Sequence, residues 1–318
     1  MLHLRLIVPP DRTPAVHELL ARHEGVTHVV HLPGAAVQPP GDVVTADVAR
    51  EAADSLVEDL TALGVAERGA LTLDAVDLSV SRGAREAEEE APGHGSDAIV
   101  WEQVAAGTQE ESTLSVTFLA LMAIATVLAG IGVLLDSPIL VIGAMVVGPE
   151  FGPTAGTCVA LVQRRWRPAA RSATALLVGF PVGALATVLS TWLLTWWGLV
   201  DRSLLEAPRP LTDFIWRPDA LSFVVALLAG VAGTLSLTSA KSGALVGVVI
   251  SVTTVPAAAN AAVAVAYGVA DEAVGSAVQL VLNLAGIVLA CLLTLLVQRR
   301  AWARRGAGLR PRTGAGAG

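Results

Sequence analysis

The chain has 318 residues, of which 53% are hydrophobic and only 15% are charged. Water-soluble globular domains carry about 25% charged residues, so this composition argues against an ordinary soluble protein. Residues 1–112 contain 20 acidic and 7 basic side chains, a net charge of −13, whereas residues 113–318 contain 8 and 14, a net charge of +6. Because the acidic part would repel phosphate groups, we expect no nucleic-acid partner.

Residues 1–80 are predicted to form a small α+β domain, because alternating apolar residues indicate strands and amphipathic spacing indicates helices. The strands are expected at residues 2–8, 26–32, 43–48 and 71–80, and the helices at residues 13–24 and 52–63. The order β-α-β-β-α-β is that of a ferredoxin-like sandwich. With no cysteine nearby, the histidines of this domain are interpreted as surface residues, so we expect neither a metal nor a cofactor.

An acidic linker and an amphipathic segment are predicted over residues 81–112. Residues 81–97 are charged, contain glycine and proline and show no apolar periodicity, which is typical of a linker. Residues 99–111, which include Trp101, have an amphipathic pattern. We expect them to lie at the membrane surface or against the α+β domain.

Six transmembrane helices are predicted over residues 113–298. A helix of about 20 residues crosses the roughly 30 Å hydrocarbon core of a bilayer, and the apolar runs after residue 112 have this length. The spans are expected at residues 112–135, 137–162, 172–200, 220–240, 242–270 and 273–298. Residues 299–318 are expected to form a basic, glycine-rich tail.

Arginine clusters predict the orientation of these spans. Four arginines lie at residues 164–171, between the second and third spans, and four more lie at residues 299–305, after the sixth. By the positive-inside rule both regions face the cytoplasm, which places both chain termini there. Residues 1–8 have the pattern of a strand rather than of a leader sequence. We therefore expect a multi-pass protein of the bacterial inner membrane, surrounded by lipid.

The two halves of the membrane region resemble each other. Leu-Ala-Gly at residues 128–130 is followed by Gly143, and Leu-Ala-Gly at residues 228–230 is followed by Gly243, so the glycines are 13 residues apart in both halves. Each half contains three spans. Because three is an odd number of crossings, the second half starts on the opposite side of the membrane and is inverted relative to the first. We therefore expect an inverted 3+3 repeat. The alternative is a chance match between helices rich in alanine, glycine and leucine.

The first candidate site is a carboxylate in a proline-broken span. Glu150 is near the middle of the second span, where an acid is costly unless it is neutral, paired or hydrated. Pro149 and Pro153 free backbone carbonyls around it, and Thr154 shares its face if the next turn is helical. We interpret Glu150 as a protonatable or cation-coordinating group. The alternative is a loop that enters the membrane only partway and keeps Glu150 at headgroup level.

The second candidate site lies in the fifth span. Thr253, Pro256 and Asn260 fall on one helical face, and Thr254 is adjacent to it. Beside a proline, such side chains and the freed carbonyl oxygens could coordinate a substrate or an ion. The alternative is that they hold neighbouring helices together, which is the usual role of serine, threonine and asparagine in membranes.

Lys241 is the one residue that suggests catalysis, because a desolvated lysine next to serines can act as a base. Its predicted place at the cytoplasmic end of a span is explained by membrane topology alone. The chain contains no phosphate-binding loop, zinc-protease motif or serine-hydrolase motif. We therefore expect no catalytic residues and no enzyme activity.

Two long motifs resemble a known family. Residues 143–156 have the sequence GAMVVGPEFGPTAG, and residues 236–260 have the sequence SLTSAKSGALVGVVISVTTVPAAAN. Both are similar to stretches of the uncharacterised bacterial membrane family called domain of unknown function 389, and the resemblance covers nearly the whole chain up to Arg312. It implies a multi-pass membrane protein with an acidic α/β domain in front, and it brings no assigned activity.

These patterns together favour a transporter or channel-like protein for a small solute or ion. Glu150 would act in one broken helix, and the polar residues of the fifth span in the other. The cytoplasmic domain would regulate the membrane part by binding a ligand or by pairing between subunits of a homo-oligomer. The alternative function is a membrane scaffold or sensor that transports nothing.

Overall fold

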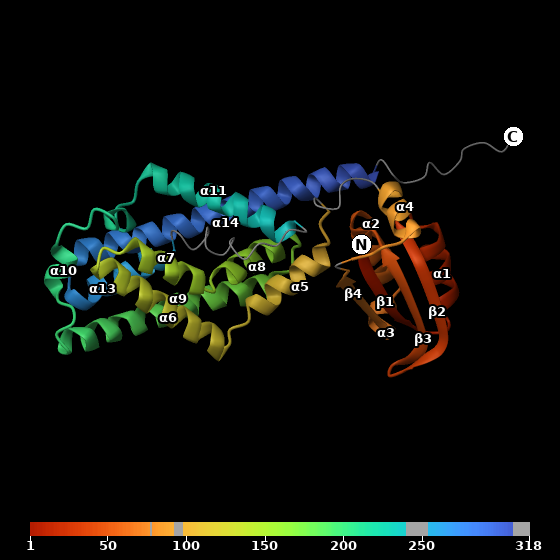
Figure 1. Ribbon diagram of the computed structural model, residues 1–318, viewed down its shortest axis with the longest axis horizontal. Helices are drawn as coiled ribbons and strands as arrows, with labels where there is room; N and C mark the ends of the chain where they lie inside the picture. Colours follow the sequence, from red (N-terminus) through yellow and green to blue (C-terminus); the bar gives the residue numbers. More distant parts are fainter. Residues whose placement is uncertain (77, 92–97, 240–253, 308–318) are drawn as a thin grey trace. The chain divides into compact units, whose positions relative to one another are not determined.

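A computed structural model describes residues 1–76, 78–91, 98–239 and 254–307, with side chains up to residue 301 (Figure 1). The chain divides into two compact units. Residues 1–104 form the first unit, and residues 105–237 with the described residues from 254 onward form the second. Lys241, Gly243 and Thr253, which carry predictions, lie outside the described residues.

The first unit contains a four-stranded antiparallel sheet in the order β2-β3-β1-β4. Its strands are β1 (Leu2–Val8), β2 (Val26–Val37), β3 (Pro40–Val48) and β4 (Ala70–Ala75). Its helices are α1 (Thr13–Arg22), α2 (Arg50–Ala62), α3 (Val65–Arg68) and α4 (Arg82–Glu90). Chain order and strand type therefore agree with the alternation read from the sequence.

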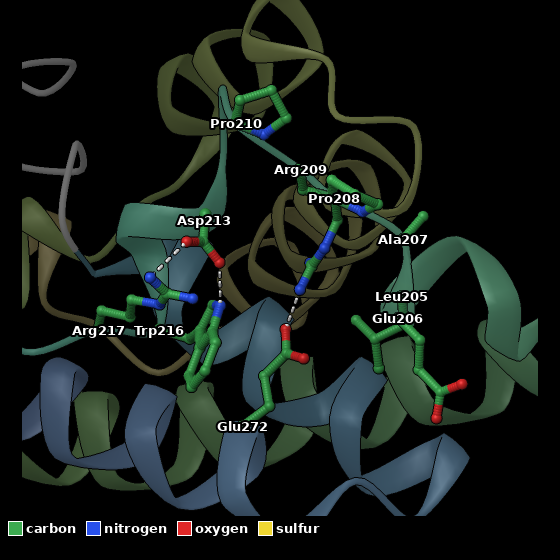
Figure 2. A pocket seen from close by; sticks show the side chains of 10 residues that line it. All are labelled: Leu205, Glu206, Ala207, Pro208, Arg209, Pro210, Asp213, Trp216, Arg217 and Glu272. Carbon is green, nitrogen blue, oxygen red and sulfur yellow. Dashed lines mark hydrogen bonds and ion pairs between the residues drawn. The ribbon is translucent and has the colours of Figure 1, made fainter.

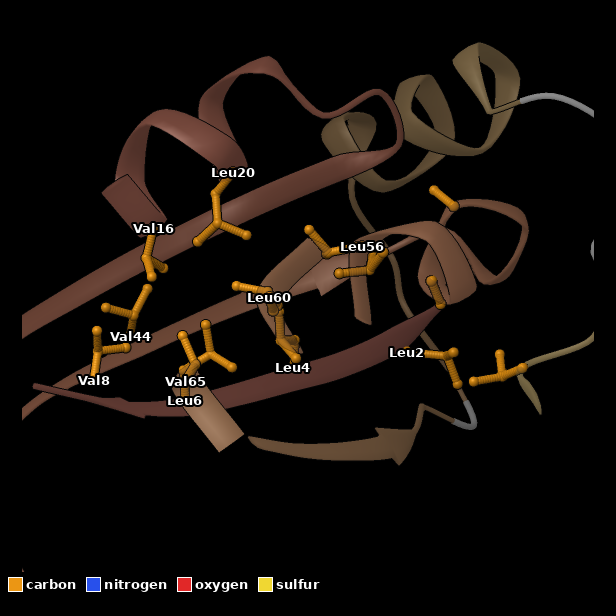
Figure 3. Close-up of a cluster of buried hydrophobic side chains, with 14 residues drawn as sticks. Leu2, Leu4, Leu6, Val8, Val16, Leu20, Val44, Leu56, Leu60 and Val65 are labelled. Carbon is orange, nitrogen blue, oxygen red and sulfur yellow. The ribbon is translucent and has the colours of Figure 1, made fainter. Parts of the chain in front are cut away.

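Large aliphatic side chains form the core between the sheet and helices α1 and α2 (Figure 3). Every second residue of β1, starting at Leu2, is at most 1% exposed, as the alternation predicts. Val16 and Leu20 of α1 and Leu56 of α2 cover them. Burying each such side chain contributes about 1.5–3 kcal/mol, so this face holds the sheet and the helices together.

Strand β2 is longer than the sequence predicts. The sequence indicates a strand that ends at Leu32, before Pro33-Gly34, but pairing with β3 continues to Val37 and Pro40. Strand β2 is at the edge of the sheet and its register shifts between Leu32 and Ala36, and edge strands with bulges tolerate proline. Strand β4 is shorter than predicted and ends at Ala75.

Part of the expected linker is helical. Helix α4 covers Arg82–Glu90, where the absence of apolar periodicity predicts no helix. The Ser81 hydroxyl accepts a hydrogen bond from the amide of Ala84 at 2.9 Å, and Arg82 pairs with Glu86 one turn later at 2.7 Å. A cap and an i,i+4 ion pair each stabilise a short helix, and neither depends on an apolar stripe.

The second unit is helical. Its long apolar helices are α6 (Val116–Leu134), α9 (Trp166–Trp196), α11 (Ala220–Thr238) and α14 (Ala270–Ala307). The shorter elements are α7 (Pro138–Val147), α8 (Phe151–Val162), α10 (Arg202–Glu206), the 3-10 turn η2 (Asp213–Ile215) and α13 (Val255–Tyr267). Helix α5 (Trp101–Glu111) contains the boundary between the units and lies within the predicted amphipathic segment.

Four helices in the described residues are long and apolar enough to cross a membrane, and α7 with α8 is a fifth if this bent pair is one span. The chain is therefore a membrane protein. The predicted fifth span, 242–270, is described only from residue 254, where α13 covers 13 residues.

Two long helices extend beyond the predicted spans. Helix α9 begins at Trp166 rather than at residue 172, because Pro168 in its first turn fits a helix start. Helix α14 continues through the arginines after residue 298 to Ala307, because arginine favours helix.

Small residues form one buried cluster of the second unit, beside a larger cluster with aliphatic residues such as Leu205 and Ile215. Ala125 and Ala129 of α6, Ala144 of α7 and Ala259 of α13 pack together with 0% exposure. Helix α8 packs against α9 and α14, and α13 packs against α6, α9 and α14. Apolar side chains such as Ile139, which is 81% exposed, cover the outside. Small residues inside and apolar residues outside are the arrangement expected of helices in lipid.

Candidate functional site

The second predicted span is broken at Glu150. Helix α7 ends at Val147, helix α8 starts at Phe151, and their axes differ by 51°. Pro149 has no amide hydrogen and forces the preceding residue out of helical geometry, so Gly148 is extended with ψ at 124°. The sequence Gly148-Pro149 thus ends α7 and places Glu150 at the amino end of α8.

Glu150 is buried inside the second unit, with an exposed fraction of 1%. Its Oε1 atom accepts a hydrogen bond from the Thr254 hydroxyl at 3.1 Å. Thr254 is also buried, at 1%. The two residues, which we call the Glu150 site, are 104 positions apart in sequence and come from the two predicted broken spans.

Thr254 immediately precedes α13, so the Glu150 site joins the amino ends of two half-length helices. A β-carbon added to Gly148 would lie 3.1 Å from Cγ2 of Val255, which shows how closely the two breaks approach. Each helix carries a partial positive charge at its amino end. Both ends therefore stabilise a negative charge on Glu150, which reduces the cost of keeping an acid away from water.

The prolines of the two breaks differ in position. Pro149 separates α7 from α8, whereas Pro153 and Pro256 lie in the first turns of α8 and α13, where proline needs no partner for its missing amide. These two prolines begin helices rather than interrupt them.

The remaining predicted residues divide between two places. The hydroxyl of Thr154 donates to the backbone carbonyl of Glu150 at 2.8 Å, so it supports the first turn of α8 rather than the carboxylate. Asn260 bonds to Arg209, Glu272 and Ser276, in a second buried cluster. Glu150, Thr254 and the neighbouring prolines are thus brought together, while the hydrogen bonds of Asn260 lead to the second cluster.

The second cluster, called the Arg209 cluster here, contains Arg209, Asn260, Glu272 and Ser276. Arg209 lies between α10 and η2, pairs with Glu272 at the start of α14, and donates to Oδ1 of Asn260 at 3.2 Å. The amide nitrogen of Asn260 donates to Glu272 at 3.0 Å and to Ser276 at 2.7 Å. Both charged side chains are at most 8% exposed, so their charges neutralise each other away from water.

A cavity of about 490 Å³ lies over the Arg209 cluster (Figure 2). Figure 2 shows the Arg209 side chain pointing toward Glu272, while Arg217 pairs with Asp213 at 3.0 Å beside Trp216. Arg209 and Glu272 form part of the wall of this cavity. The Nε atom of Arg209 has no hydrogen-bond partner among the described residues.

Helix α14 carries a polar stripe that the sequence interpretation missed. Glu272, Ser276, Gln279 and Asn283 are separated by four, three and four residues, which places them on one helical face, and each is at most 6% exposed. The i, i+4, i+7, i+11 spacing inside an apolar run could have revealed the stripe. Arg209 gave no such signal, because its partners come from other helices.

The polar stripe borders a second cavity. A crevice of about 220 Å³ is lined by Gln279 and Asn283 of α14, by Pro256 of α13, and by Asp219 and Ser222 at the start of α11. The Oε1 atom of Gln279 lacks a hydrogen-bond partner within the described part of the chain. Pro256 is two residues from Thr254, so the crevice reaches the neighbourhood of the Glu150 site.

These side chains can bind a proton or coordinate a small ion through oxygen atoms. Carboxylate, hydroxyl and amide oxygens are ligands for hard cations, and a buried carboxylate can also carry a proton. Within residues 1–76, 78–91, 98–239 and 254–301, no three histidine, cysteine or acidic side chains are grouped as a metal centre would require.

Comparison with known proteins supplies the family. Residues 145–289 match the family described as domain of unknown function (DUF389). No curated protein and no solved structure matches the chain. The matched segment begins in α7 and ends in α14, so it contains the Glu150 site, the Arg209 cluster and the polar stripe. Over residues 145–289 the chain is therefore similar to the DUF389 family, through the helices that carry its buried polar groups.

Proposed function

We propose that the protein is a transporter or channel-like protein for a small solute or ion, with Glu150 as its central binding group. The observation that carries the proposal is the hydrogen bond between buried Glu150 and Thr254, where the amino ends of two half-length helices meet. Broken helices that meet inside the membrane are the usual binding sites of transporters with repeated halves.

An inverted 3+3 repeat with six spans is part of this proposal. In support, five of the nine buried positions of α6 recur in α11 100 residues later: residues 126, 129, 130, 133 and 134 are buried, and so are 226, 229, 230, 233 and 234. Gly130 lies against Thr187 of α9, and Gly230 lies against Ala290 of α14. Each matched glycine thus allows the first span of its half to approach the third.

Helix lengths agree with a site near mid-membrane. At about 1.5 Å per residue, α8 is about 18 Å long and α13 about 20 Å, each roughly half of what a bilayer requires. Each half-helix could therefore run from the Glu150 site to one membrane surface. A re-entrant loop would also contain short helices, but burial of Glu150 to 1% argues against a carboxylate at headgroup level.

The first unit is proposed to be a cytoplasmic regulatory domain of ferredoxin-like type. The strand order β2-β3-β1-β4 with antiparallel neighbours supports this fold. Its edge strand β2 leaves Val30 and Leu32 almost half exposed, so pairing between copies of a homo-oligomer could use this edge. The arginines at residues 164–171 support a cytoplasmic orientation.

The test is a flux measurement with the full chain in proteoliposomes, comparing Glu150→Gln with the unchanged protein and with Glu110→Gln. Glu110 is an exposed acid at the end of α5, so its variant controls for loss of one negative charge. Glu150→Gln keeps the shape of the side chain and is expected to abolish flux. The elution volume on size exclusion should be equal for all three proteins.

The alternative, a scaffold or sensor that transports nothing, predicts a different result. No flux of protons, alkali cations or small anions would then be found for the unchanged protein, and Glu150→Gln would leave it unaltered in every assay. That outcome would overturn the proposed function.

A further inference from the structure

The polar stripe begins at the Arg209 cluster and leads toward the Glu150 site. Glu272 and Asn283 are 11 residues apart, a distance of about 16 Å along the helix. Helix α13 runs beside α14, and its Asn260 bonds to Ser276 at 2.7 Å. Pro256, one turn before Asn260, lines the same crevice as Gln279 and Asn283. The polar positions of α13 and α14 therefore face a common seam.

Two buried atoms along this seam are left without partners. The Oε1 atom of Gln279 and the Nε atom of Arg209 have no hydrogen-bond partner among the described residues, and both side chains are at least 94% buried. A buried acceptor without a partner costs about 1–3 kcal/mol. The oxygen of Gln279 borders the crevice, where a passing cation or water could satisfy it.

The charges along the seam favour a cation. Carboxylates lie at its two ends, Glu272 and Glu150, and a third, Asp219, lines the crevice between them, where the other polar groups are amides and hydroxyls. The one basic side chain in the Arg209 cluster is Arg209 itself, and it already occupies the position of a cation beside Glu272. An entering cation would replace the guanidinium as the partner of Glu272.

We propose that the α13–α14 seam is the route by which a small monovalent cation passes between the cavity of Figure 2 and Glu150, a proposal that rests on the proposed function. We assign to Arg209 the role of closing the end of this route at the cavity, which we call its mouth. Gln279 is the ligand at the middle of this route. Glu272 attracts the cation when Arg209 swings away into the 490 Å³ cavity.

The test measures flux in proteoliposomes with two probes in parallel, radioactive rubidium for alkali cations and a trapped pH dye for protons. Arg209→Gln removes the closing charge and is expected to raise cation flux about tenfold, which corresponds to lowering a barrier by about 1.4 kcal/mol. Gln279→Leu removes the central oxygen and is expected to lower it about tenfold. The probe that responds identifies the cation as an alkali ion or a proton.

Matched controls are available on the same elements. Arg202→Gln removes an exposed arginine that pairs with Glu206 before the loop, and Thr294→Val removes a hydroxyl of α14 that donates to the carbonyl of Ala290 in its own helix at 2.8 Å. Both are expected to leave flux unchanged. Arg209→Gln leaves Glu272 buried without its positively charged partner, which could destabilise the protein. The double variant Arg209→Gln/Glu272→Gln removes both charges and avoids this cost. Its cation flux should still exceed that of the unchanged protein.

Three outcomes would overturn the route. If flux depends on Glu150 but is the same in the Arg209, double and Gln279 variants as in the controls, the seam is not the route, while the proposed function stands. If flux is carried by an anion, measured with a chloride-sensitive dye, and not by either cation, the cation assignment is wrong. Absence of flux from every variant would remove the proposed function and the route together.

Discussion

The two units of this protein build their interiors differently. The first unit buries leucines and valines and leaves most of its acids at the surface, whereas the second adds buried alanine, glycine and threonine, and the charged residues Glu150, Arg209 and Glu272, to its aliphatic clusters. In water, apolar area removed from solvent stabilises the core. In lipid that gain is absent, so close approach of small residues and satisfied polar pairs take its place.

The largest effect is expected from separating the buried ion pair of the second unit. Glu272→Leu leaves Arg209 buried without a counter-charge, which should destabilise the second unit by about 3–5 kcal/mol. The double variant Arg209→Leu/Glu272→Leu removes both charges and should cost clearly less. Thermal unfolding of the full chain in detergent compares them, and equal losses for the two variants would contradict a buried pair.

A loss of about 3 kcal/mol is expected from Leu4→Ala in the first unit, because Leu4 is 0% exposed and the sheet cannot close the cavity. Hydrogen exchange of the sheet amides in the full chain reports this free energy of unfolding. Val37→Ala, at a position 90% exposed, should change it by less than about 0.5 kcal/mol. Similar exchange in the two variants would show that the leucine core does not hold the sheet.

Glycine substitutions test close approach in the second unit. A β-carbon at position 132 would lie 2.9 Å from Cγ2 and 3.0 Å from the amide nitrogen of Val141, so Gly132→Ala should cost about 1–3 kcal/mol. Position 143 has open space, so Gly143→Ala should stabilise α7 by up to about 1 kcal/mol. Melting temperatures that move in the same direction for both variants would refute the packing described.

The smallest effect concerns an acid that the first unit keeps partly buried. Burial raises the pKa of Asp54 from its ordinary 3.8 to about 6, although the amide of Trp101 donates to it at 3.0 Å and partly opposes the shift. The folded state therefore holds the proton more tightly than the unfolded state. This group's contribution to stability is present below about pH 4 and is lost as the pH rises to 6.

Asp54→Asn keeps an oxygen for the amide of Trp101 and removes the charge. It should raise the melting temperature of the first unit by roughly 2–4 °C at pH 7.5 and leave it unchanged at pH 4. Differential scanning of the full chain at both pH values provides the comparison. A gain at pH 4 as large as at pH 7.5 would show that the charge of Asp54 is not responsible.

Local patterns predicted much of this structure. The alternation in β1 and the stripes of α1 and α2 report burial directly, so their positions follow from the sequence. Gly148-Pro149 likewise predicts a break, because proline's missing amide acts on its own neighbours. Helix α4 escaped prediction because its buried residues, Ala84 and Ala87, are too small to give an apolar stripe in the sequence, and because a cap and an ion pair add to its stability.

Contacts between distant segments could not be predicted in the same way. The sequence predicted Glu150 and Thr254 as members of two separate polar sites. No pattern near either residue indicates the hydrogen bond between them. Asn260 was grouped with Thr253 and Pro256 by helical face, yet it bonds toward α14 because Glu272 and Ser276 lie there. In the sequence Arg209 looks like an ordinary charged residue of a loop. Its burial depends on helices elsewhere in the chain, so the sequence of the loop alone does not reveal it.

The central claim is that the breaks before α8 and α13 meet at Glu150, and disulfide trapping tests it most directly. In a full chain lacking native cysteines through Cys158→Ala and Cys291→Ala, the pair Gly148→Cys/Val255→Cys joins the two breaks, and Gly132→Cys/Val141→Cys is a control of similar closeness. With copper phenanthroline in native membranes, both pairs should form disulfides. A disulfide in the control pair but none between positions 148 and 255 would contradict the account.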